Sequence, residues 1–203
     1  MSRIIVFGAG GRAGRRVVAE ATARGHQVTA AVRDPERYEG DAVAADVTDA
    51  DSVAAVVAGH DAVVSVAYAA GVASGEFFPA AARALVRGLT RAGVGRLVVA
   101  GIGTTLETAP GVAVHDAPDF PAEHRDFSLG HTAELAVLRA ADLDWVVVAP
   151  PPVALGEGDG TGSYRAAVTT LIPAESFTYA DFAIALVDEA TTPKHSRVLL
   201  AVA

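Results

Sequence analysis

Short apolar runs alternate with amphipathic segments along most of the chain. Most of the runs are continuous rather than alternating with polar residues, as in strands that are buried on both faces of a parallel sheet. We expect strands over residues 4–7, 26–33, 42–45, 61–66, 96–100, 145–149, 166–170 and 197–202.

The segments between these runs carry apolar residues at helical spacing, and glycine or proline marks several helix boundaries. Repeated strand and helix units predict an α/β fold, a Rossmann-like doubly wound parallel sheet with helices on both faces. Helices are expected up to Gly25, from about Asp51 after a cap by Thr48 or Asp49, and over residues 79–91, 129–141 and 179–189.

Residues 106–128 interrupt the pattern, because they contain three prolines and several polar side chains at no regular spacing. A stretch of this length without a period is usually a functional lid or an exposed excursion in a compact domain. We therefore expect a loop there.

The length of 203 residues suits a single domain over 1–203, with a C-terminal part from about 150 to 203 that contributes a substrate cleft. No apolar run is long enough to span a membrane, and the N-terminus has the pattern of a core strand rather than of a signal peptide. We therefore expect a cytoplasmic protein without a membrane partner.

Composition excludes several classes of function. The chain has no cysteine, which excludes disulfide scaffolds, thiol catalysis and cysteine-bound metals. Its formal net charge of −8 argues against a nucleic-acid partner. A small-molecule substrate fits this composition, and the chain could be a monomer or a homodimer.

The strongest chemical signal is a glycine-rich turn between the first strand and the first helix. Glycine is needed where a pyrophosphate approaches backbone N–H groups at a helix N-terminus, because a Cβ would block it. The turn can be parsed as the start of G-x-G-x-x-G or as G-x-x-G-x-x-G, and the second pattern accounts for three of its glycines. It predicts a dinucleotide site formed by Gly8, Gly10, Gly11, Arg12, Ala13 and Gly14.

The end of the second strand indicates which nicotinamide cofactor is bound. A carboxylate there would hold a ribose 2′-hydroxyl, but this chain has Arg33. A guanidinium pairs bidentately with phosphate, and Arg12 could reach the same 2′-phosphate. NADPH is therefore the expected cofactor, with NADH possible, although Arg33 could also be only a solvated charge.

Other strand ends complete the expected cofactor site. Asp46 and Val47 follow the third strand, where they could contact an adenine, and Ala67 follows the fourth. Gly101 and Gly103 follow the fifth strand, at the edge where ligands of open α/β sheets bind.

The catalytic prediction starts from an absence. The usual Tyr-x-x-x-Lys pair cannot form, because Lys194 is the only lysine and residue 190 is alanine. The remaining type of reaction is hydride transfer to a flavin or another conjugated acceptor, because this transfer needs little acid catalysis. Thr104 could orient the acceptor or only cap a loop. His131, on the inward face of its helix, could relay a proton or simply pack. No ligand spacing indicates a metal.

The glycine turn, with Arg33-Asp34-Pro35, Asp46-Val47-Thr48-Asp49, Thr161-Gly162-Ser163 and similar stretches, resembles the atypical short-chain dehydrogenases described as NADH-flavin reductases or NAD(P)H-binding proteins. More distantly, the chain is similar to biliverdin IXβ/flavin reductase, in which a histidine stands where His131 does. The resemblance implies a Rossmann fold, NAD(P)H at the turn and Arg33, and a shallow cleft over the nicotinamide. It differs after the fifth strand, where Ile102 and Thr104 replace smaller residues.

We therefore predict an NADPH-dependent oxidoreductase that passes hydride to a flavin or another conjugated acceptor. Two alternatives remain open. One is an NmrA-like sensor that binds the dinucleotide without turnover, which the missing Tyr–Lys pair favours. The other is a non-redox isomerase or cyclase on the same fold.

Overall fold

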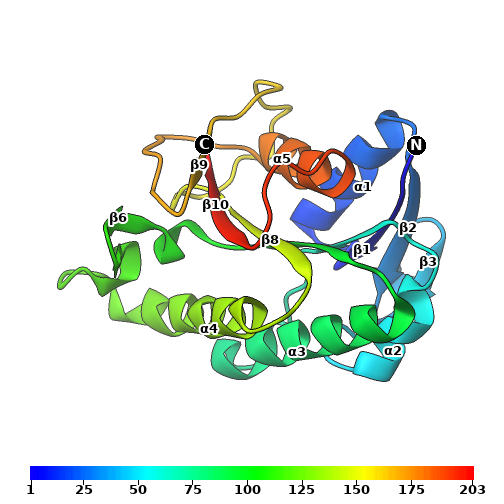
Figure 1. Ribbon diagram of the computed structural model, residues 1–203. Coiled ribbons are helices and arrows are strands. Elements are labelled where there is room, and N and C mark those ends of the chain that lie inside the picture. Colours follow the sequence, from blue (N-terminus) through cyan, green and yellow to red (C-terminus); the bar gives the residue numbers. More distant parts are fainter.

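The computed structural model describes residues 1–203 and contains one eight-stranded sheet between two layers of helices (Figure 1). The order across the sheet is β3-β2-β1-β4-β5-β8-β10-β9, and every neighbouring pair is parallel except β10 with β9. The strands are β1 (Arg3–Phe7), β2 (Gln27–Val32), β3 (Ala42–Ala44), β4 (Ala62–Ser65), β5 (Arg96–Ala100), β8 (Asp144–Ala149), β9 (Ala166–Val168) and β10 (Val198–Val202).

The predicted Rossmann-like fold is confirmed. The first six positions in the sheet follow the strand order of dinucleotide-binding folds, in which the chain reverses direction across the sheet between β1 and β4. Because the strands are parallel, the carboxyl ends of β1, β2, β4 and β5 open at one edge.

Helices cover both faces of the sheet (Figure 1). One layer consists of α1 (Arg12–Ala23) and α5 (Tyr179–Thr191), and the other consists of α2 (Ala50–Val57), α3 (Ser74–Ala92) and α4 (Ala122–Arg139). Asp49 caps α2, as one of the two expected residues, because its carboxylate accepts the N–H groups of Asp51 and Ser52.

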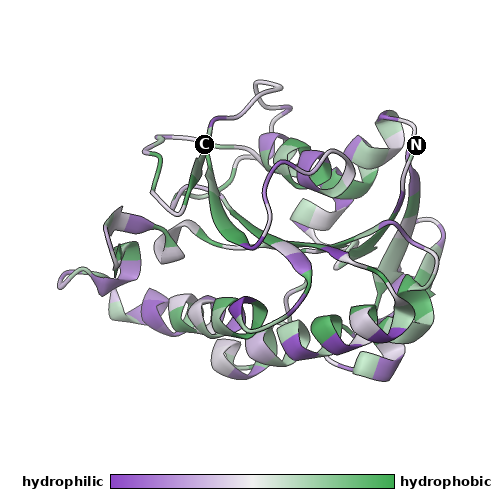
Figure 2. Ribbon diagram, viewed as in Figure 1, coloured by the Kyte–Doolittle hydropathy of each residue, from purple (hydrophilic) through white to green (hydrophobic).

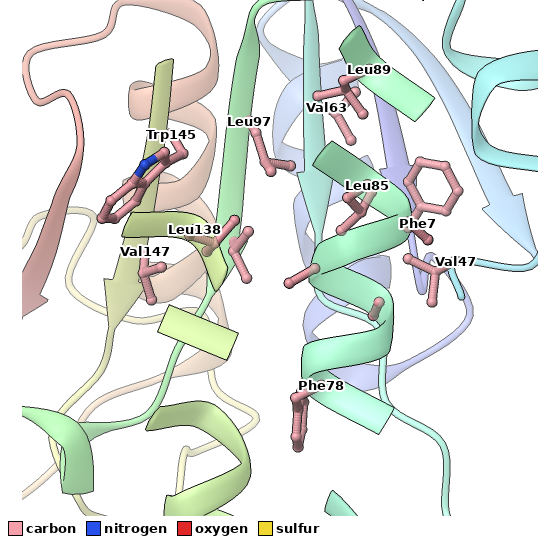
Figure 3. Packing of buried hydrophobic residues seen from close by; sticks show 14 of the residues in the cluster. Phe7, Val47, Val63, Phe78, Leu85, Leu89, Leu97, Leu138, Trp145 and Val147 are labelled. Atoms are coloured by element: carbon pink, nitrogen blue, oxygen red, sulfur yellow. The ribbon is translucent and has the colours of Figure 1, made fainter. Parts of the chain in front are cut away.

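Successive residues of the strands supply two separate cores. In β1, Ile5 and Phe7 belong to the cluster beneath α2, α3 and α4, whereas Ile4 and Val6 belong to the cluster beneath α1 and α5. Figure 3 shows Leu85 and Leu89 of α3 over the strands that carry Phe7 and Val63, and Leu138 close to Trp145. Figure 2 shows that the strands are largely hydrophobic, while polar residues lie mainly on the outer faces of helices and in loops.

The helix expected over 79–91 begins earlier, at Ser74, so Pro79 lies inside α3 rather than in its first turn. Pro79 lacks the N–H that would bond to Gly75. The extra turn is stabilised by Phe77 and Phe78, which are buried in the core and gain about 1.5–3 kcal/mol each from burial. That gain outweighs the lost hydrogen bond.

The prediction of a loop over residues 106–128 was also wrong in part. These residues contain the hairpin of β6 (Glu107–Ala109) and β7 (Val112–Ala113), and α4 begins at Ala122 rather than near Leu129. The first turns of α4 are mostly exposed and polar, so they carry no apolar period. Gly130 allows α4 to approach α3, because a Cβ there would lie 2.7 Å from the backbone of Ser74.

The ends of β5 and β8 are locked together at the sheet edge. A Cβ on Gly103 would lie 2.5 Å from the Pro150 carbonyl oxygen and the Pro152 nitrogen, and one on Gly101 would lie 2.5 Å from Val147 Cγ1. Both glycines are therefore required by the packing of the protein itself, whatever ligand lies above them.

Candidate functional site

Two glycines of the turn after β1 are fixed by the fold. Gly8 has a φ of +80°, and a Cβ there would lie 2.8 Å from backbone atoms of Ala67. A Cβ on Gly14 would lie 2.1 Å from the carbonyl oxygen of Gly8. Side chains at these two positions would push β1, β4 and α1 apart.

The other two glycines are not required in this way. A Cβ on Gly10 would meet nothing closer than Tyr38 Cδ2 at 3.7 Å, and one on Gly11 would meet the Gly8 carbonyl oxygen at 3.4 Å. Both residues line a cleft. The bare backbone at Gly10 therefore leaves room that the protein does not fill, as close approach of a ligand requires.

The N-terminus of α1 points its free amides toward this turn. Its cap residue Gly11 provides no side-chain hydrogen bond, and its first turn, which includes Ala13 and Gly14, holds no acidic residue. The amide N–H groups and the positive end of the helix dipole therefore remain available for an anion such as a pyrophosphate.

A first cleft of about 700 Å³ lies along the carboxyl ends of β1, β2, β3 and β4. This volume is within the range of small-molecule and cofactor sites. The cleft brings together seven of the residues predicted to bind the cofactor, namely Gly8, Gly10, Gly11, Arg33, Asp46, Val47 and Ala67.

Two arginines and three carboxylates line this first cleft, namely Arg33, Arg37, Asp34, Asp46 and Glu76. Arg33 and Arg37 both line it, and Arg37 forms an exposed ion pair with Asp34 at 3.8 Å. Asp46 accepts hydrogen bonds from the hydroxyl and the amide of Thr48 at 2.7 and 2.8 Å, which lower its pKa, and the charge of Arg33 lowers it slightly further. Asp46 is thus anionic and held in place.

Arg12 lies elsewhere. The two guanidinium groups were expected to converge on one phosphate, but only Arg33 borders the first cleft. The side chain of Arg12 lies over the ring of Tyr179, 5.0 Å from its centroid, and its Nη1 is 3.8 Å from Glu157 Oε1. The nearby carboxylate and the aromatic face draw the guanidinium away from Arg33.

The Arg12 side chain lines a second cleft of about 430 Å³, at the carboxyl ends of β5 and β8. Gly101, Gly103 and Thr104, which follow β5, are among its lining residues. The opposite parts of its lining come from α4, from the proline-rich segment after β8 and from α5, namely His124, Phe127, Ser128, Pro150, Pro151, Pro152, Val153, Ala154, Leu155, Tyr179 and Phe182.

Thr104 is held at the edge of this second cleft by two hydrogen bonds. Its Oγ1 is 2.8 Å from Ser128 Oγ, and its carbonyl oxygen lies 2.7 Å from Nδ1 of the buried His115. The Ser128 hydroxyl in turn donates to the carbonyl of His124 at 3.0 Å. A chain of hydroxyl groups with a defined direction therefore borders the second cleft.

His131 lines neither cleft. Its ring is 5% exposed, lies 3.8 Å from the Phe78 ring between centroids, and has Nδ1 2.9 Å from Glu134 Oε2. Burial raises the pKa of the Glu134 carboxyl, although the hydrogen bond from His131 opposes this rise. The structure thus places His131 in the packed boundary between α3 and α4, and its catalytic role stays a prediction.

A tyrosine and the single lysine do share a shallow pocket, but the chemistry is unsuitable for a catalytic pair. Tyr164 and Lys194 both line it, and it shares no lining residue with either cleft. Burial and the hydrogen bond to Asp188 at 2.9 Å raise the Tyr164 pKa. A tyrosine that exchanges protons needs the opposite shift.

Sequence reasoning missed several lining residues. Arg37 follows Arg33 by four positions, and only the short 3-10 helix Pro35–Arg37 returns it to the cleft. Ser128 and Phe127 lie in the part of α4 that was expected to be a loop. No local pattern marks Tyr179 as a neighbour of Arg12, because the two begin helices far apart in the chain.

The structure contains no group of three or more His, Cys, Asp or Glu side chains arranged to hold a metal ion. No helix combines the length and the apolar character needed to cross a bilayer.

Comparison with known proteins agrees with this geometry. A family model described as NAD(P)H-binding matches residues 8–193. The Bacillus subtilis protein YwnB, which is uncharacterised, is 32% identical over 201 residues, which cover 95% of this chain and 94% of YwnB.

Solved structures are similar over nearly the whole chain. A protein from Burkholderia pseudomallei, named as exported by inference, is 38% identical with a TM-score of 0.90, and all of both chains is covered. A Streptococcus pneumoniae protein named for an inferred NADH-flavin reductase activity is 28% identical with a TM-score of 0.85, and covers 100% of this chain and 99% of its own.

A Bacteroides thetaiotaomicron protein named for an inferred epimerase activity is 29% identical with a TM-score of 0.87, over 99% of this chain and 96% of its own. The matched residues begin at the glycine turn and include the ends of β2, β4, β5 and β8 that border the two clefts. The chain belongs to the family of NAD(P)H-binding proteins, within the atypical short-chain dehydrogenases that the sequence resembles.

Proposed function

We propose that this protein is an NADPH-dependent reductase that passes hydride to a flavin or a similar conjugated acceptor. The observation that carries the proposal is the junction of the two clefts at the start of α1. Gly10 and Gly11 line the first cleft, and the next residue, Arg12, lines the second. A dinucleotide whose phosphates lie at this turn can extend its two ends in opposite directions along the sheet edge.

The adenosine end is expected in the first cleft. Asp46 and Val47 lie there, and Arg33 and Arg37 lie on the same side. Arg37 is already paired with Asp34, so the preference rests on Arg33, whose guanidinium favours an additional phosphate over a free hydroxyl. This arrangement supports NADPH over NADH.

The nicotinamide end is expected beside Gly101 and Gly103, facing the second cleft. When bound, the reduced cofactor supplies a hydride, and the acceptor takes one proton from water, so that the oxidised dinucleotide and the two-electron-reduced acceptor result. The protein would mainly orient the acceptor, and the hydroxyl groups of Thr104 and Ser128 are placed to do so.

His131 remains a candidate for an indirect role. Its ring packs against Phe127, which lines the second cleft, with 5.0 Å between ring centroids. We expect His131→Ala to lower turnover more than dinucleotide affinity, measured by steady-state kinetics and calorimetry. Unchanged turnover would leave His131 with a packing role only.

The proposed function is tested by loss of absorbance of reduced nicotinamide with FMN, FAD and quinones as acceptors. Steady oxidation of NADPH that depends on enzyme and acceptor is the expected result. The Gly10→Ala variant serves as the control, because it should fold and yet lose the dinucleotide. Absence of oxidation with every acceptor would contradict the proposal.

A sensor that binds the dinucleotide without turnover is the second candidate. The position of the single lysine favours it, because Lys194 lines neither cleft and so cannot assist a tyrosine there. Tight NADPH binding in the calorimeter with no oxidation would support the sensor, or an isomerase or cyclase. A cytoplasmic location and a monomeric or homodimeric state are further expectations.

A further inference from the structure

The second cleft has a cationic side chain and no carboxylate in its lining. Among its lining residues, only Arg12, His124 and Tyr179 can ionise, and no carboxylate is among them. This contrasts with the whole chain, which has 24 Asp and Glu against 16 Lys and Arg. An acidic protein that leaves this cleft free of acidic lining provides a local site for an anion.

The rest of the lining suits a flat apolar body. Phe127 on α4 and Ile102 after β5 lie on one side, and Tyr179 and Phe182 on α5 lie on the other. Aromatic side chains offer large faces to a planar ring at a small entropic cost. The cation of Arg12 lies over one of these faces, at Tyr179.

A carboxylate of the protein already approaches Arg12. Glu157, in the loop after β8, lies 3.8 Å from Arg12 and does not itself line the cleft. The loop is tied to α1 by Arg16, which donates to the Glu157 carbonyl and pairs with Asp159 at 3.9 Å. Glu157 is therefore held where it can exchange with an external anion for the same guanidinium.

We propose that the second cleft selects planar acceptors that carry an anionic group, with Arg12 and His124 holding that group and Glu157 competing for Arg12. This inference rests on the proposed reductase function and names the substrate class. Arg12 offers a bidentate fork to a phosphate or a carboxylate. The His124 ring can donate a hydrogen bond in either charge state.

Substitution of Arg12 and substitution of Glu157 should change the use of anionic acceptors in opposite directions. Arg12→Gln removes the cation, so it should lower kcat/KM for anionic acceptors more than for neutral ones. Glu157→Gln removes the competing carboxylate, so it should strengthen anionic acceptors and leave neutral ones unchanged. A purely structural role of the Arg12 and Glu157 pair would change both kinds of acceptor together and in the same direction.

The test uses two pairs of flavins that share one ring system and differ in charge. FMN is compared with riboflavin for a phosphate, and 10-carboxymethylflavin is compared with lumiflavin for a carboxylate. For each flavin, kcat/KM is measured at saturating NADPH, and the affinity for NADPH is measured separately. The ratio within a pair cancels any effect of Arg12 on the cofactor.

We expect the wild-type protein to favour the charged member of each pair by about tenfold, as for one charge-assisted hydrogen bond in a partly solvated site. Arg12→Gln should bring the ratio close to one. Glu157→Gln should raise it by about threefold, in line with an exposed ion pair. His124→Gln should lower the ratio less than Arg12→Gln does.

Failure of this inference can be distinguished from failure of the proposed function. Equal use of charged and neutral flavins, or variants that leave the ratios unchanged, would overturn the inference while the reductase function stands. If none of the flavins oxidises NADPH in the presence of the protein, the proposed function fails. Fluorescence titration of the four flavins in the presence of NADP⁺ then decides the inference, since equal affinities or no binding would overturn it.

Discussion

The two clefts at the carboxyl edge of the sheet are built in different ways. The first is formed by the turn after β1 and by the strand ends that follow directly in the chain, up to the beginning of α3. The second is assembled from four distant segments, beginning at Gly101, His124, Pro150 and Tyr179, together with Arg12. Backbone geometry shapes the first cleft, whereas side chains shape the second.

This difference indicates how each cleft should respond to mutation. At the glycine turn, one added methyl group meets backbone atoms that cannot move independently of the sheet. In the second cleft, Arg12, His124 and Phe127 can be replaced without moving the strands. We therefore expect changes of stability and cofactor binding from the first cleft, and changes of acceptor preference from the second.

The largest effect should come from Gly14→Ala. The added Cβ would lie 2.1 Å from the Gly8 carbonyl oxygen and 2.7 Å from Ala9 Cα, so α1 would have to move away from β1. We expect the free energy of unfolding to fall by about 3 kcal/mol, as for severe overpacking. Urea denaturation measures it, with Gly75→Ala as control, since a Cβ there has no neighbour within 4 Å. Equal stability of the two variants would contradict the steric argument.

Gly10→Ala separates folding from binding within the same turn. The added Cβ has no protein atom within 3.7 Å, so we expect the free energy of unfolding to change by less than about 0.5 kcal/mol. The dissociation constant of NADPH should rise by at least about tenfold, or 1.4 kcal/mol, because the methyl group occupies the space of the phosphates. Calorimetric titration measures this. A variant that binds as tightly as the wild-type protein would show that no ligand approaches Gly10.

Arg33→Glu tests whether the first cleft holds a 2′-phosphate. We expect the dissociation constant of NADPH to rise by about thirtyfold, the equivalent of a lost charge-assisted hydrogen bond, and that of NADH by less than about threefold. Arg139→Glu, an exposed charge reversal in the last turn of α4, is the matched control. Equal weakening of both dinucleotides would exclude the assignment.

The smallest effect concerns the boundary between the clefts. Tyr68 lines the first cleft, Phe127 lines the second, and their rings lie 5.8 Å apart between centroids. Behind Phe127, His131 is hydrogen-bonded to Glu134. Glu134 lines neither cleft, so replacing it should alter folding in a pH-dependent way rather than alter either cleft directly.

Burial raises the pKa of Glu134 in the folded state above its unfolded value. The folded protein then binds more protons than the unfolded chain at intermediate pH, so this carboxyl favours folding at low pH and loses that contribution as pH rises through the folded pKa. Glu134→Gln cannot titrate. The free energy of unfolding of this variant minus that of the wild type should therefore increase from pH 5 to pH 8. Urea denaturation at both values checks the sign, and a difference independent of pH would contradict it.

The elements that sequence could predict are those with local signals. The parallel strands, the glycine turn and Arg33 at the end of β2 all follow from residues close together in the chain. The direction of the Arg12 side chain could not be predicted in this way, because it depends on the distant residues Glu157 and Tyr179. The early start of α4 was missed since its exposed polar turns have no apolar period.

The crossing of Gly103 beneath Pro150 and Pro152 has a consequence for how such proteins diversify. There is no space for even one methyl group between Gly103 and this segment. Any related protein that keeps the same packing must therefore keep glycine at this position of the second cleft. New acceptor specificities then have to arise from the first turns of α4 and from the segment that carries Glu157. Directed evolution of the acceptor range should accordingly accumulate substitutions in these two segments and leave Gly103 unchanged.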